Sequence, residues 1–131
     1  MELEWESDFE TGNEDVDLQH RYFLDLINRI RKSFSESNDI AYKEKLIIEL
    51  RKYADFHFTS EENIATSCNL SGISAHHQRH LELLEEFEHH AEDLANGLKT
   101  IDQFLGFLTD WFVGHTIYED KTLFKKKKRG S

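Results

Sequence analysis

The chain contains no proline in its 131 residues and only 6 glycines. Proline and glycine interrupt helices more strongly than any other residues, so their scarcity favours long, uninterrupted helices. Polar, turn-forming segments near residues 11–13, 35–39, 68–72 and 96–97 divide the sequence. We therefore predict four helices, over residues 17–36, 40–66, 73–96 and 100–120.

Each predicted helix carries an apolar stripe with the three- and four-residue spacing of one helix face. In the first helix the stripe includes Phe23, Ile27 and Ile30. Short connections make consecutive helices antiparallel neighbours. We expect an all-α fold, an antiparallel up-down-up-down four-helix bundle with an N-terminal arm whose Trp5 and Phe9 pack along the outside. Residues 1–131 are expected to form a single domain, with the arm over 1–16, the bundle over 17–120 and a basic tail over 121–131.

The net charge of −10 is unevenly distributed, because the last eleven residues carry six positive charges and no acids. Residues 1–120 are therefore even more acidic than the whole chain. Such a negatively charged domain would repel a phosphate backbone, which argues against nucleic acid as a partner. A solvated, frayed terminus is the favoured interpretation of the basic tail, ahead of contact with an acidic surface or lipid. No apolar run is long enough to span a membrane, and the acidic N-terminus does not resemble a signal peptide. The expected location is cytoplasmic, and a lone cysteine, Cys68, allows no internal disulfide.

Polar residues occupy several core-facing positions of the predicted helices. A buried polar group without a partner costs about 1–3 kcal/mol, so a set of them needs an explanation. Each of these residues lies near the start of the first or third helix or near the end of the second or fourth. These four helix ends meet at one level of an up-down-up-down bundle. The set comprises His20, His57, Glu61, His76, His80 and His115.

The spacing of these residues suits metal binding. His57 with Glu61, and His76 with His80, are pairs four residues apart, stacked about 6 Å apart on one helix face. Imidazole and carboxylate together suit iron, manganese or zinc. Five imidazoles and one carboxylate fill a single six-coordinate ion, and a seventh ligand would overfill it, so the count favours two metals with bridging carboxylates.

Two acidic residues near the end of the fourth helix compete for the role of seventh ligand. Asp120 lies five residues after His115, which turns the two about 140° apart on a regular helix. Glu119, four residues after His115, fits the face better by spacing alone. Of the other histidines, His77 is expected to point away from the site, His89 to be solvated, and His90 to lie about 15 Å away along the helix axis.

In these residues the sequence resembles the bacterial hemerythrins, whose ligands follow the order of a lone His, then HxxxE, HxxxH and HxxxxD. Here the four motifs are His20, His57–Glu61, His76–His80 and His115–Asp120, and their order makes the resemblance specific. The resemblance implies one iron bound by His76, His80 and His115 and a second bound by His20 and His57. Glu61 and Asp120 would bridge the two irons together with an oxo or hydroxo group, and the family pattern here favours Asp120 over Glu119.

The resemblance also implies a function. The second iron would bind dioxygen inside an apolar pocket. The candidate residues for this pocket, each of which could equally be an ordinary member of the hydrophobic core, are Phe23, Ile27, Ile64, Leu108, Trp111 and Phe112. The segment 64–73 departs from the family in lacking its usual Met and Tyr-Pro. Reversible dioxygen binding without turnover, for storage, transport or sensing, is the leading hypothesis. The alternatives are a di-iron enzyme acting on oxygen, peroxide or nitric oxide, and a metal-free interaction bundle. We expect a monomer, with a sensor or effector domain as partner only if the chain is cut from a longer protein.

Overall fold

Side-chain caps set where the helices of the computed structural model begin. Asn13 accepts a hydrogen bond from the Val16 amide (3.1 Å) and starts α1 (Glu14–Glu36) three residues before the predicted position. Asp39 caps α2 (Ile40–Ser67) through the Tyr42 amide in the same way. Gly72, whose positive φ of 83° suits glycine, precedes α3 (Ile73–Ala95). Thr100 and Gln103 form a reciprocal capping box at the start of α4 (Ile101–Thr109).

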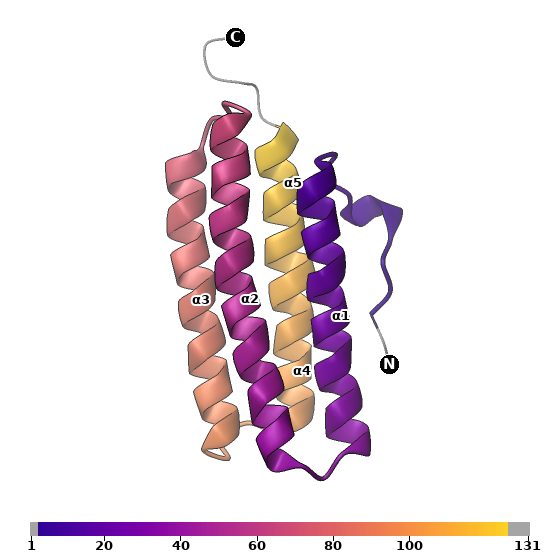
Figure 1. Cartoon of the computed structure of the whole chain (residues 1–131). Coiled ribbons are helices and arrows are strands. Elements are labelled where there is room, and N and C mark those ends of the chain that lie inside the picture. Colours follow the sequence, from indigo (N-terminus) through magenta and orange to yellow (C-terminus); the bar gives the residue numbers. More distant parts are fainter. Residues whose placement is uncertain (1–2, 126–131) are drawn as a thin grey trace.

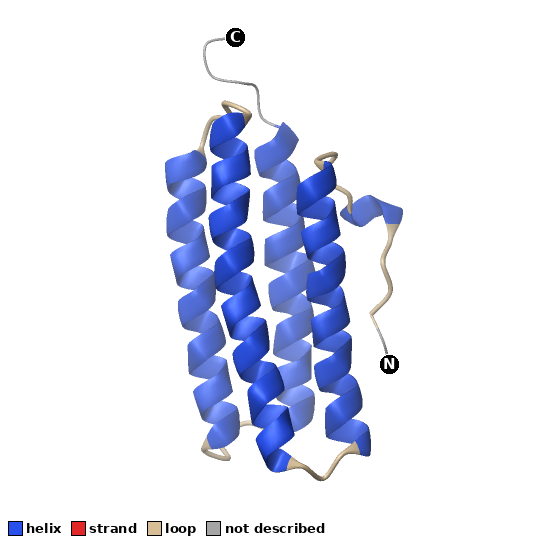
Figure 2. Cartoon of the chain, in the orientation of Figure 1, coloured by secondary structure: helices blue, strands red, loops and turns tan. Residues whose placement is uncertain are grey.

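The helices form the predicted bundle. α1, α2 and α3 alternate in direction, and the fourth rod is continuous through α4, a π-helical segment η2 (Asp110–Ile117) and α5 (Tyr118–Lys125) (Figure 1). The structure describes residues 3–125, and within that range the side chain of His115 is not described. Helices joined by short loops account for nearly all of the described chain, with no strand among these residues (Figure 2). The prediction of an all-α up-down-up-down bundle is confirmed.

A continuous apolar core fills the bundle. Leu50, Leu83 and Phe104 are among its fully buried members. The stripes become exposed toward the bundle ends, where Phe34 and Leu94 are only partly buried and Ile101 is exposed. The core therefore runs the length of the bundle but is loosest at the end formed by the α1–α2 and α3–α4 loops.

A second, small apolar cluster closes the other end of the bundle. Ala65, Leu70 and Leu123 are buried there, with Ile73 and Phe124 packed against them. Leu123 belongs to the segment predicted as a frayed basic tail, but residues 121–125 continue the fourth rod as α5. The remainder of that tail, 126–131, lies outside the described residues.

The N-terminal arm packs along α1 as predicted. Phe9 is buried, Trp5 contacts it edge-on with ring centroids 5.6 Å apart, and the Arg21 guanidinium lies over the Trp5 ring. Asn28 exchanges two hydrogen bonds with the backbone of Leu3. Over the described residues, no helix combines the length and the hydropathy that crossing a membrane requires.

Candidate metal centre

Six of the seven predicted site residues meet inside one end of the bundle. His20 comes from α1, His57 and Glu61 from α2, His76 and His80 from α3, and Asp120 from α5. All six are buried, and the most exposed of them, His76, shows 9% of its surface. The backbone of the seventh, His115, runs through η2, but its side chain lies outside the described residues.

The six side chains form two overlapping groups. One consists of His20, His57, Glu61 and Asp120, and the other of Glu61, His76, His80 and Asp120. Within each group the possible ligand atoms lie within 4.8 Å of one another. Because the two carboxylates belong to both groups, the arrangement has room for two cations side by side with Glu61 and Asp120 between them.

The imidazoles present their Nε2 atoms to these shared carboxylates. His20 Nε2 lies 2.7 Å from Asp120 Oδ2, and His57 Nε2 lies 3.3 Å from the same oxygen. On the other side, His76 Nε2 lies 2.5 Å from Glu61 Oε1 and 3.0 Å from Asp120 Oδ1, while His80 Nε2 lies 3.2 Å from Glu61 Oε1. His57 Nε2 also lies 3.5 Å from Glu61 Oε2, so each carboxylate contacts histidines of both groups.

Two buried atoms in the cluster test whether it fits metal ions. Glu61 Oε2 and His80 Nε2 are shielded from solvent, and although His57 Nε2 lies 3.5 Å from the first and Glu61 Oε1 lies 3.2 Å from the second, neither atom makes a hydrogen bond among the described residues. A buried carboxylate oxygen without a donor is costly in a metal-free protein, and a bound cation would satisfy it. Nitrogen and carboxylate donors without thiolate match the preferences of iron, manganese and zinc. The residues present therefore fit a pair of transition-metal ions.

Neighbouring polar residues orient the rings. Gln19 Oε1 lies 2.8 Å from His57 Nδ1, and the Gln19 amide donates to Ser60 Oγ at 2.9 Å. Glu62 Oε2 lies 2.8 Å from His80 Nδ1. A partner on Nδ1 fixes the tautomer and leaves Nε2 for a metal. The sequence analysis predicted no role for Gln19 or Glu62. The signal that could have identified them is their position in the chain, since Gln19 directly precedes His20 and Glu62 directly follows Glu61.

The carboxylates of the metal-free cluster keep two of its histidines, His57 and His76, protonated at neutral pH. Burial alone lowers the pKa of His57 and His76, but hydrogen bonds and charge interactions with Asp120 and Glu61 outweigh it and raise the pKa of His57 to about 9 and that of His76 to about 10. Burial raises the pKa of Asp120, yet hydrogen bonding within the cluster holds it well below its usual range. Metal binding must therefore displace protons from the imidazoles.

The π-helix explains why Asp120, and not Glu119, faces the cluster. If the fourth rod were a regular α-helix, Phe104 and Asp120 would point about 160° apart. Both are nevertheless buried, because η2 makes wider turns that bring residues five apart into line. Thr116 Oγ1 donates to the carbonyl of Trp111, five residues back, at 3.2 Å. Glu119 instead faces α3, where it accepts from Arg79 Nε at 3.0 and 3.2 Å.

Aromatic side chains separate the cluster from the rest of the core. Phe58 stacks on His80 with centroids 4.1 Å apart, Phe23 meets His57 edge-on at 5.8 Å, and Phe112 meets His20 edge-on at 6.1 Å. Of the residues proposed for a pocket around the site, all are buried except Ile64, which is half-buried; the buried ones are Phe23, Ile27, Leu108, Trp111 and Phe112.

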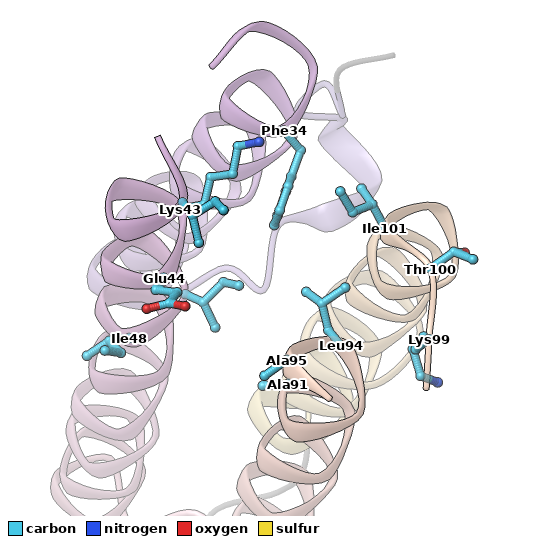
Figure 3. Close-up of a pocket in the computed structure, with 12 residues that line it drawn as sticks. Phe34, Lys43, Glu44, Ile48, Ala91, Leu94, Ala95, Lys99, Thr100 and Ile101 are labelled. Carbon is cyan, nitrogen blue, oxygen red and sulfur yellow. The ribbon is translucent and has the colours of Figure 1, made fainter. Parts of the chain in front are cut away.

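The remaining histidines stay outside the cluster. His77 is 55% exposed and pairs with Glu62, and His89 is exposed on the surface of α3. His90 stacks on Phe107 with centroids 3.8 Å apart. A cavity of about 680 Å³ lies at the opposite end of the bundle (Figure 3). Its lining is mainly apolar, with Phe34, Ile101 and Leu94 facing the space, and it includes none of the cluster residues.

Fold and site together define a class of protein: a four-helix bundle with a buried histidine–carboxylate centre able to hold two cations. The family model for the hemerythrin HHE cation-binding domain matches residues 11–126, so the chain belongs to the hemerythrin family. It is 27% identical to the bacteriohemerythrin of Clostridium acetobutylicum, over 89% of this chain and 95% of that protein. It is 28% identical to the hemerythrin-like protein of Naegleria gruberi, over 85% and 82%. A bacteriohemerythrin of Pseudomonas aeruginosa is 25% identical over 90% and 76%. The resemblance to bacterial hemerythrins found in the sequence is confirmed.

Proposed function

We propose that this protein is a non-heme di-iron protein that binds dioxygen reversibly, for storage, transport or sensing. The observation that carries the proposal is the pair of four-residue groups sharing Glu61 and Asp120, which provides two cation positions joined by carboxylates. Membership of the hemerythrin family supports iron as the metal and dioxygen as the ligand. When bound, a pair of ferrous ions supplies the two electrons that dioxygen takes up.

The proposed ligands divide between the two positions. His76 and His80 would hold one ion and His20 and His57 the other, with Glu61 and Asp120 available to both positions. His115 is proposed as the third histidine of the first ion, on the family pattern alone. The position between His20 and His57 has fewer protein ligands, so it has room for a small external ligand. Phe23 and Phe112 beside it keep water away, which favours return of dioxygen over its release in reduced, protonated form.

Binding without turnover is proposed over catalysis. Five histidines and two carboxylates form a donor set with few anionic ligands, which stabilises highly oxidised iron less than a carboxylate-rich set would. Steady-state consumption of oxygen, peroxide or nitric oxide by the iron-loaded protein would favour the enzymatic alternative. A single domain over 1–131, a monomeric state and a cytoplasmic location stay predictions, as does a sensor or effector partner in a longer chain.

Visible spectroscopy tests the proposal. The iron-loaded protein, reduced and then exposed to oxygen, is expected to develop a visible absorption band that disappears when oxygen is removed. The His76→Ala variant is expected to lose iron and the band, whereas His77→Ala, which changes the adjacent exposed histidine, is expected to keep both. An iron-replete, reduced sample that shows no oxygen-dependent band would contradict the proposal.

A further inference from the structure

The cluster has one exposed edge among the described side chains. His76 is the most exposed of them, at 9%, whereas none of the others exceeds 2%: His20, His57, Glu61, His80 and Asp120. His76 lines a cavity of about 310 Å³ between α3 and α5. The opposite wall of that cavity comes from α5, through Tyr118, Glu119 and Thr122. The cavity therefore connects solvent to His76, one of the two histidines of the group Glu61, His76, His80 and Asp120.

Other sides of the cluster among the described residues are covered by apolar side chains or by polar side chains that already have partners, namely Gln19 between His57 and Ser60 and Glu62 between His80 and His77. The end of the bundle is capped by Ala65, Leu70 and Leu123. Toward the middle of the bundle the cluster meets aromatic rings, with Phe58 on His80 and Phe112 on His20. A hydrated divalent cation is poorly accommodated by either apolar barrier, because leaving water without polar partners is costly for an ion. The cavity between α3 and α5, which exposes His76 and carries Arg79 and Glu119 on its wall, is the favourable path.

Arg79 and Glu119 set the charge at this cavity. Both line it, and the Glu119 carboxylate accepts two hydrogen bonds from Arg79 Nε, at 3.0 and 3.2 Å. Arg79 also lies 3.5 Å from Glu86 and 3.9 Å from Glu82 on its own helix. Its guanidinium is thus a positive charge among three carboxylates, beside the cavity onto which His76 opens.

We propose that this cavity is the path by which divalent metal ions enter and leave the centre, with the Arg79–Glu119 pair setting the rate of passage. The proposal rests on the two-metal centre proposed above. An ion passing along this path meets His76 first, so the Glu61–His76–His80–Asp120 position exchanges before the His20–His57 position. The shared carboxylates Glu61 and Asp120 lie between the two positions and provide the ligands for transfer from one to the other.

The charge argument makes opposite predictions for the two partners of the ion pair. Arg79→Gln removes the positive charge and leaves the carboxylates, so cation entry should accelerate. Glu119→Gln removes a negative charge and leaves Arg79, so cation entry should slow. We expect changes of roughly tenfold in each direction at low ionic strength, shrinking as salt is added. Loss of stability alone would shift both variants in the same direction, since both break the same ion pair.

The experiment uses Co²⁺ as a spectroscopic probe. Stopped-flow absorbance would follow Co²⁺ binding to the metal-free full chain, and a chelator would then extract it, with release expected in two phases of equal amplitude. The matched controls are Arg51→Gln and Glu88→Gln, which change the same charges in an ion pair between α2 and α3 with an Arg51 Nη2–Glu88 Oε1 distance of 2.7 Å. Neither residue lines the cavity beside His76, so both controls should load within about twofold of the unchanged protein.

The outcomes separate this inference from the proposed function. Opposite rate changes in Arg79→Gln and Glu119→Gln, with unchanged controls, would support the path. Two bound Co²⁺ ions per chain with equal rates in all variants, or with the same shifts in the controls, would overturn the path and leave the metal centre standing. Failure of the unchanged protein to bind two ions would overturn the centre and the path together.

Discussion

The two halves of the bundle are built on opposite principles. The half containing Leu50, Phe87 and Phe104 has an apolar interior, where each fully buried side chain contributes about 1.5–3 kcal/mol. The half containing Glu61 and Asp120 instead encloses a buried polar cluster within a shell of aromatic side chains, and the groups of that cluster lose hydration on burial. Burial of the apolar half therefore stabilises the fold and offsets the unfavourable free energy of burying the polar groups. Folding and metal binding should therefore be separable by mutation, because they depend on different halves of the bundle.

Removing a shared carboxylate should have the largest effect. Glu61→Ala and Asp120→Ala each delete a ligand of both metal positions, so metal content is expected to fall from two ions per chain to background. The helical circular dichroism should persist, because the apolar half is unchanged. Metal analysis after desalting measures the effect, and Glu49→Ala, an exposed carboxylate on the same helix as Glu61, is the control. A Glu61→Ala protein that retains two ions would contradict the shared role.

Truncating the apolar half should do the reverse. Phe87→Ala creates a cavity in the core and is expected to destabilise the protein by about 3–5 kcal/mol. Metal stoichiometry should stay at two, since Phe87 does not belong to either ligand group. Urea unfolding of the metal-free protein measures the loss of stability. Leu81→Ala, at an exposed position of the same helix, should change stability by less than about 0.5 kcal/mol. Loss of metal in proportion to the loss of stability would show that the halves are not separable.

The polar half should make the metal-free protein sensitive to pH. The pKa values of His57 and His76 are raised to about 9 and about 10 on folding, so their contribution is complete below pH about 6.5 and is lost as the pH rises through those values. The lowered pKa of Asp120 adds stability that is lost as the pH falls below about 4. Metal-free stability should thus be greatest between about pH 4 and 6.5 and decline above it by an amount on the order of a few kcal/mol.

Urea unfolding at several pH values checks this dependence. The metal-loaded protein should behave oppositely between pH 5 and about 7, since metal displaces protons and binds more tightly as they are removed. A metal-free protein whose stability stays level from pH 6.5 to 10 would show that the histidine–carboxylate contacts do not persist without metal.

The smallest of the four effects is expected at the partners of the histidines. Gln19→Leu removes the acceptor that holds His57 Nδ1 at 2.8 Å and should weaken metal binding about tenfold to a hundredfold. Competition with a chelator of known affinity would measure it. Gln78→Leu, at an exposed position of α3, serves as the control. Equal affinities in the two variants would mean that the remaining contacts of the His57 ring, with Phe23 and Phe58, hold it in place without Gln19.

Much of this architecture could be predicted from the sequence, because stripes and depths follow from helix periodicity. His57 and Glu61 share a face simply by being four residues apart, and the alternating helix directions bring them level with His20 and His76. Asp120 could not be placed in that way, since the prediction assumed regular helix geometry and η2 departs from it. Gln19 and Glu62 look like surface residues by type, and only the structure places them beside the rings. The Arg79–Glu119 contact depends on how closely α3 and α5 approach, which spacing within one helix does not encode.

The π-helix also matters for the length of the chain. Its wider turns mean that residues 110–117 hold about one residue more than an α-helix joining the same two ends would need. A sequence one residue shorter here could run as a regular helix and still turn both Phe104 and Asp120 inward. The same deletion between Leu50 and Glu61 would rotate one of them out of the core by about 100°. When related chains are aligned, a single gap is therefore far more tolerable around the exposed Gly114 than within α2.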